Sequence, residues 1–159
     1  MSVEIRQSLA VKARTACIAE LGVIMVRVIM GLQGHGKTKQ IIELTNKAAN
    51  EDLTVACIER GTKLTYDISH KARLVDVSGY FIESYEHLKA FICGMYSGNY
   101  DLSKIFIDSL YKVSKCDFAK QTDDFLLWAE SFGEEHGIDF VITISADDST
   151  ASDTIRKFF

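Results

Sequence analysis

The sequence contains no proline, and its four cysteines are too scattered to form a metal or disulfide framework. Cys17, Cys57, Cys93 and Cys116 include no Cys-x-x-Cys pair, so we expect buried, reduced thiols rather than zinc ligands or disulfides. The chain also lacks an apolar run of about 18–20 residues, the length that a membrane-spanning helix needs. The absence of proline excludes no particular chemistry.

Basic residues are in slight deficit, with 18 Lys and Arg against 22 Asp and Glu and a formal net charge of −4. Nucleic-acid and membrane surfaces usually require a basic face, so the composition favours neither as a general partner. Lys12 and Arg14 interrupt the N-terminal apolar residues, which argues against a secretory signal. We therefore expect a cytoplasmic protein.

The 159 residues suit a single domain, preceded by one segment of uncertain attachment. Periodic apolar residues predict a helix over 3–21 that ends at Gly22. Because Met25 lies near the start of the next apolar run, residues 1–22 are either an appended segment or a helix packed on the domain. The predicted domain itself covers residues 23–159.

Strand-like and helix-like stretches then alternate along the chain. The predicted strands are residues 23–30, 53–58, 73–77, 104–107 and 140–144. The predicted helices are residues 37–50, 84–96 and 117–136, with a short helical tail in 152–159. In the helix 117–136, Phe118, Phe125, Trp128 and Phe132 are spaced for one face. This alternation predicts an α/β fold, a three-layer α/β/α sandwich around a mostly parallel five-stranded sheet.

Residues 31–38 read Gly-Leu-Gln-Gly-His-Gly-Lys-Thr and match the pattern G-x-x-x-x-G-K-[ST] of a phosphate-binding P-loop (Walker A). In such a loop the backbone N–H groups and the following helix N-terminus face the phosphates. Lys37 would contact the β- and γ-phosphates and assist catalysis, and the Thr38 hydroxyl would bind Mg²⁺. The sequence therefore predicts a site for ATP with Mg²⁺. The predicted nucleotide-binding residues are Gly31, Gln33, Gly34, His35, Gly36, Lys37 and Thr38.

A second acid-bearing element follows the apolar residues 105–107. Asp108 comes directly after them, as does the Walker B aspartate that holds Mg²⁺ beside the P-loop threonine. Asp101 and Asp117 are rival acids, but neither directly follows an apolar strand. We therefore predict Thr38 and Asp108 as the metal-binding residues.

Hydrolysis also requires a group that orients or deprotonates the attacking water. The residue after the predicted metal-binding aspartate is Ser109 rather than a glutamate, so an adjacent catalytic carboxylate is missing. Glu59 ends the strand predicted at 53–58, and the carboxyl ends of such strands face the ligand crevice. Glu59 is therefore the candidate catalytic base. The alternative is a solvated carboxylate that pairs with Arg60 or Lys63.

Polar residues near the C-terminus offer two weaker hypotheses. Ser145, or Thr143 before it, ends the last predicted strand and could sense the γ-phosphate, although strand ends are commonly polar. Arg156, together with Lys157, could reach the nucleotide of a neighbouring subunit, or both could be solvated charges of the tail.

These features together resemble the RecA/KaiC/DnaB-like (ASCE) branch of P-loop ATPases over residues 23–145. In that branch a strand-end glutamate matches Glu59, a Walker B segment matches residues 107–110 (Ile-Asp-Ser-Leu), and a polar sensing position matches Ser145. The resemblance implies a RecA-like fold that binds ATP and Mg²⁺. A looser likeness links the chain to small stand-alone ATP-binding proteins of unassigned role.

The resemblance has limits that narrow the expected function. The extra strands and DNA-binding loops of recombinases and helicases, and an obvious arginine finger, are missing, so a motor on DNA is not expected. Thymidine kinases share a similar core but carry an Asp-Glu pair and a four-cysteine zinc region that this sequence lacks. The leading hypothesis is an ATPase that acts on a protein partner or on its own assembly as a homo-oligomer. The alternatives are a non-hydrolysing regulatory module, or a small-molecule kinase whose acceptor pocket would involve residues 61–80.

Overall fold

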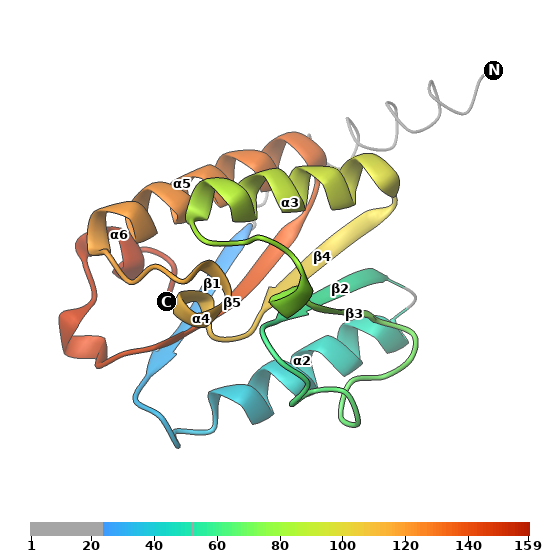
Figure 1. The fold of residues 1–159 in the computed structure, drawn as a ribbon, viewed down its shortest axis with the longest axis horizontal. Helices are drawn as coiled ribbons and strands as arrows, with labels where there is room; N and C mark the ends of the chain where they lie inside the picture. Colours follow the sequence, from blue (N-terminus) through green and yellow to red (C-terminus); the bar gives the residue numbers. More distant parts are fainter. Residues whose placement is uncertain (1–23, 52) are drawn as a thin grey trace.

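Five parallel strands form one sheet at the centre of the protein, which a computed structural model describes for residues 24–51 and 53–159 (Figure 1). The helix predicted at 3–21, its end at Gly22 and the attachment of residues 1–22 lie outside the described residues. The strand order is β1-β5-β4-β2-β3, and every neighbouring pair is parallel. The strands are β1 (Val26–Gly31), β2 (Thr54–Glu59), β3 (Arg73–Asp76), β4 (Leu102–Ile107) and β5 (Asp139–Ser145).

Helices cover both faces of this sheet and make a three-layer α/β/α fold. Helix α2 packs on one face, and α3 and α5 lie side by side on the other (Figure 1). The helices are α2 (Lys37–Asn50), α3 (Tyr85–Gly98), α4 (Leu110–Ser114), α5 (Ala119–His136) and α6 (Asp153–Arg156). The predicted α/β class and the five strands are confirmed, with the sheet entirely rather than mostly parallel.

The direction of the crossovers explains this division of helices between the faces. The connection from β1 through α2 passes over β5 and β4 to reach β2, whereas the connections through α3 and α5 return in the opposite direction. Because crossovers between parallel strands are right-handed, connections that run in opposite directions lie on opposite faces. The strands are consequently covered on both sides, which accounts for their near-continuous apolar sequences.

Local signals in the sequence set most helix ends. Ser84 caps α3 by accepting a hydrogen bond from the His87 N–H at 3.2 Å, and Gly137 ends α5 in the left-handed conformation, both as predicted. Ser152 likewise caps the short helix α6 of the predicted tail. Phe118 is a correction: its side chain is 68% exposed, because it is the residue before α5 and not part of the buried helix face.

The topology also determines where a ligand would sit. All five strands end at the same edge of the sheet, and the chain leaves the neighbours β2 and β4 in opposite directions. In open α/β sheets such a switch point leaves a crevice beyond the carboxyl ends of the strands. Among the described residues, no helix is long and apolar enough to cross a bilayer.

Candidate functional site

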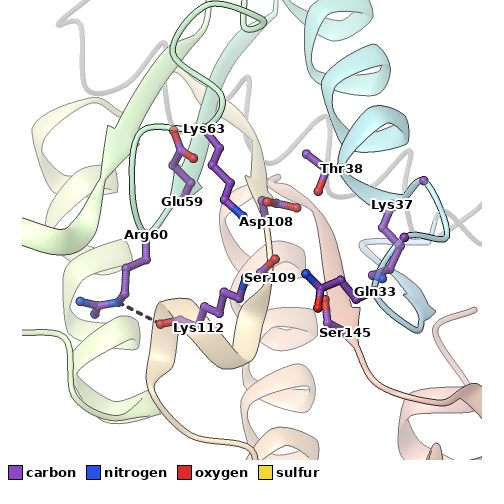
Figure 2. A pocket seen from close by; sticks show the side chains of 12 residues that line it. Gln33, Lys37, Thr38, Glu59, Arg60, Lys63, Asp108, Ser109, Lys112 and Ser145 are labelled. Carbon is purple, nitrogen blue, oxygen red and sulfur yellow. Dashed lines mark hydrogen bonds between the residues drawn. The ribbon is translucent and has the colours of Figure 1, made fainter.

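A cavity of about 330 Å³ lies at this edge of the sheet (Figure 2). One side, which we name the loop wall, comes from the β1–α2 loop and the start of α2. The other, the strand-end wall, comes from the ends of β2, β4 and β5 and the segments after β2 and β4. The loop wall consists of Gln33, Gly34, Gly36, Lys37 and Thr38. The strand-end wall consists of Glu59, Arg60, Lys63, Asp108, Ser109, Lys112 and Ser145.

The conformation of the loop wall depends on its glycines. Gly34 and Gly36 have φ angles of 87° and 76°, in the left-handed region that other residues rarely adopt. Helix α2 begins directly after Gly36, and the Gln40 N–H already donates to the Gly36 carbonyl at 3.0 Å. The positive end of the α2 dipole therefore borders the cavity, an arrangement that favours an anionic ligand.

Lys37 is a buried residue whose partly buried ammonium group lies at the cavity. Its Nζ donates to the Leu32 carbonyl at 2.7 Å, so the side chain folds back across its own loop. Burial lowers the pKa of Lys37, and the nearby Asp108 carboxylate partly offsets that effect. An ammonium has three N–H donors, so Lys37 can bind an oxyanion while keeping or exchanging this carbonyl contact.

Asp108 follows β4 and is held by a buried threonine of the neighbouring strand. The Thr143 hydroxyl donates to the Asp108 carboxylate at 2.9 Å and accepts a hydrogen bond from the Ser109 N–H at 2.7 Å. Figure 2 shows the Asp108 carboxylate and the Thr38 hydroxyl facing each other across the cavity. The rival acids Asp101 and Asp117 do not line this cavity.

Thr38 and Asp108 supply two oxygen donors of the kind that Mg²⁺ prefers. Within the described parts of the chain, no three His, Cys, Asp or Glu side chains are grouped so that they could hold a metal ion. A cation at this position would therefore complete its coordination with water and with oxygens of a ligand. Mg²⁺ commonly binds to proteins in this way together with phosphates. Thr38 and Asp108 therefore fit a Mg²⁺ ion that is also bound to an anionic ligand.

Glu59 is the last residue of β2, and its side chain is only 3% exposed. Its two carboxylate oxygens lie 3.2 and 3.3 Å from the Leu64 nitrogen, which donates a hydrogen bond to them. Burial raises the pKa of Glu59, the Leu64 N–H counteracts this, and the Asp108 charge raises the pKa further. The alternative of a solvated carboxylate paired with Arg60 or Lys63 is wrong for the described structure, since Glu59 is buried and has no ion pair there.

Arg60 points away from Glu59 and ties two segments of the strand-end wall together. Its Nε donates to the Lys112 carbonyl at 2.9 Å, and its Nη2 donates to the carbonyls of Ile82 and Val113 at 2.6 and 3.1 Å (Figure 2). The segment after β2 is thereby joined to α4. Sequence reasoning missed this role, because Arg60 and its partners are far apart along the chain.

The segment after β2 is anchored by a carboxylate at the end of β3. Asp76 Oδ1 accepts hydrogen bonds from the Gly61 N–H at 2.8 Å and from the N–H and hydroxyl of Ser78 at 2.9 and 2.6 Å. The Ser78 hydroxyl and the two N–H groups hold the pKa of Asp76 below its usual value. Asn46 of α2 adds a second clamp, since its side-chain amide bonds to the backbone of Asp67 and Ser69. The strand-end wall is thus held in place by side chains.

The remaining candidates fall at different distances from the cavity. Ser145 lines it, whereas Gly31 and His35 do not. The His35 ring packs over Gly31, where a Cβ would come within 3.4 Å of His35 Nδ1. Arg156 also lies outside the cavity lining and donates to the backbone carbonyls of Asp148, Ser149 and Ala151.

Comparison with known proteins identifies no relative: no protein-family model matches the chain, and no curated protein matches it.

Proposed function

We propose that this cavity binds ATP with Mg²⁺ and that the protein is an ATPase with a P-loop core of the RecA/KaiC-like branch. The observation that carries the proposal is the pairing of two elements across one cavity. A glycine-rich loop with Lys37 and Thr38 stands opposite Asp108 at the end of a parallel strand. The loop supplies N–H donors and a lysine for the phosphates, and the threonine and aspartate supply oxygen ligands for the cation.

The charges of the cavity agree with this ligand. The lining contains four cationic side chains, Lys37, Arg60, Lys63 and Lys112, and two carboxylates. A triphosphate remains anionic after it has bound one Mg²⁺, so an excess of positive charge in the lining favours it. When bound, Mg²⁺ would neutralise part of the phosphate charge, with Thr38 and Asp108 as its protein ligands.

Glu59 supports hydrolysis as the next step. A buried carboxyl group with a raised pKa is a better proton acceptor than an exposed one, and Glu59 lies in the cavity lining beside Asp108. The same residue also supports the second candidate function, a nucleotide-binding module without turnover. The Leu64 N–H holds the Glu59 carboxylate on the side of the loop after β2. Measuring phosphate release separates the two functions.

Calorimetric titration with a non-hydrolysable ATP analogue and Mg²⁺ tests the proposal. We expect binding by the wild type and a loss of affinity of at least about 100-fold in Lys37→Ala, because the Lys37 ammonium is the charged donor of the loop wall. Lys39→Ala is the matched control, since Lys39 lies two residues away with an exposed side chain in a long 4.0 Å ion pair. Equal affinity of the wild type and Lys37→Ala would overturn the proposal.

A further inference from the structure

The four cations that line the cavity differ in their contacts with the described part of the chain. Lys37 donates to a carbonyl of its loop, and the Arg60 guanidinium is occupied by three carbonyls. By contrast, within residues 24–51 and 53–159, the ammonium groups of Lys63 and Lys112 make no hydrogen bond or ion pair. Both lie in the strand-end wall, across the cavity from the glycine-rich loop.

The backbones that carry these two lysines are fixed. Lys63 precedes Leu64, whose side chain is fully buried and whose N–H is bonded to Glu59. The Lys112 N–H donates to the Ser109 carbonyl at 2.8 Å, and its own carbonyl accepts from Arg60. Only the side chains would lose freedom on binding a ligand, so a contact adds no entropic cost from ordering the backbone.

The two side chains converge from different segments. In Figure 2, Lys63 extends from the loop after β2 toward Asp108, and Lys112 extends from α4 toward Ser109. Both lysines are exposed residues, and their amino groups reach toward the cavity from the side opposite the glycine-rich loop. A triphosphate whose inner phosphates contact that loop would present its terminal phosphate to them.

We propose that Lys63 and Lys112 contact the terminal phosphate of the bound triphosphate and stabilise the charge that moves during its hydrolysis. This inference rests on the proposed ATPase function. In the reaction, a water oxygen bonds to the γ-phosphorus, and the bond from that phosphorus to the β–γ bridging oxygen breaks. The electron pair stays on the β-phosphate, and Glu59 accepts the proton that the water loses. Two ammonium groups at the γ-phosphate would offset negative charge at this point.

The site then draws its cations from one chain. A diphosphate lacks the group that the two lysines contact, so they also distinguish the nucleotide before hydrolysis from the product.

The test uses Lys63→Met, Lys112→Met and the double variant, with Lys71→Met as the matched control. Lys71 is an exposed lysine of the same segment that does not line the cavity. We expect each single change to lower kcat on the order of 10- to 100-fold, and the double change to lower it further. Affinity for a non-hydrolysable triphosphate should fall by more than affinity for the diphosphate, and Lys63→Arg should recover part of the loss.

The outcomes separate this inference from the function on which it rests. If the wild type binds and hydrolyses ATP but the lysine variants match it in kcat and in the triphosphate-to-diphosphate affinity ratio, the lysine inference alone is overturned. A wild type that binds no ATP would overturn both. Equal losses of triphosphate and diphosphate affinity would show that the lysines only attract anions, and would also overturn the inference.

Discussion

The two walls of the cavity are built by different means. In the loop wall, backbone conformation sets the shape: Gly34 and Gly36 turn the chain, and α2 begins at once. In the strand-end wall, side chains hold backbone groups from distant parts of the chain, as Asp76 holds Gly61 and Thr143 holds Ser109. The loop wall is therefore a local structure, whereas the strand-end wall exists only in the folded sheet.

This difference suggests that the two walls have different roles. A contiguous loop with a helix N-terminus suits any phosphate chain, so under the proposed function the loop wall would account for binding. The strand-end wall carries Glu59, Lys63 and Lys112, the groups that under the two proposals would discriminate and react. Changes in the strand-end wall should accordingly alter turnover and metal dependence more than affinity.

The strongest test of this difference in roles is Glu59→Gln. We expect nucleotide affinity close to that of the wild type and a loss of turnover of about 100-fold or more, because the amide cannot accept the proton of the attacking water. Phosphate release and calorimetry measure the two quantities. Glu43→Gln, on the exposed side of α2, is the control. Identical phosphate-release rates in Glu59→Gln and the wild type would leave Glu59 a structural role and favour the non-hydrolysing module.

Thr143→Val should have a smaller effect on function, confined to the dependence of nucleotide binding on Mg²⁺. The change keeps the shape of the side chain but removes the hydroxyl that links Asp108 to Ser109. We expect the Mg²⁺ concentration for half-maximal nucleotide binding to rise about 10-fold, and the free energy of unfolding to fall by about 1–3 kcal/mol.

Thr45→Val is the matched control for that experiment. Thr45 is also fully buried, but its hydroxyl donates to the Ile41 carbonyl within α2, away from the cavity lining. Thr45→Val should lower the free energy of unfolding without changing the Mg²⁺ dependence of nucleotide binding. If Thr143→Val and Thr45→Val have the same Mg²⁺ dependence, the threonine of β5 is merely part of the core.

The smallest effect is expected for Asp76→Ala, which releases the start of the loop after β2. Loss of the hydrogen bonds to Gly61 and Ser78 should lower the melting temperature by about 2–5 °C at neutral pH. Because folding lowers the pKa of Asp76, its stabilisation is present above the unfolded pKa of about 3.9 and disappears as the pH falls through the folded value.

The difference in melting temperature between the wild type and Asp76→Ala should therefore shrink on acidification. Asp67→Ala, an exposed acid of the same segment, serves as the control and should melt with the wild type. A difference that stays constant down to about pH 2 would show that the Asp76 carboxylate charge is not involved.

The sequence predicted the loop wall more completely than the strand-end wall. The glycine and lysine positions of residues 31–38 are a local code, and Glu59 and Asp108 were found because each ends an apolar run. Lys63 and Lys112 gave no such signal, since their place in the cavity depends on β2 lying beside β4. Helix α4, which carries Lys112, has five residues and is too short to show a helical period.

The order of strands in the sheet has a consequence for synthesis of the protein. Strand β1 has β5 as its partner strand, in a register that joins Val26 to Phe140, and the Val28 N–H on its edge donates to the carbonyl of Phe158. During synthesis β1 cannot pair with β5 until β5 has left the ribosome. Contacts between residues this far apart in sequence also form slowly. The glycine-rich loop is synthesised before β5, yet we expect the cavity to take its final shape only when β5 has joined the sheet.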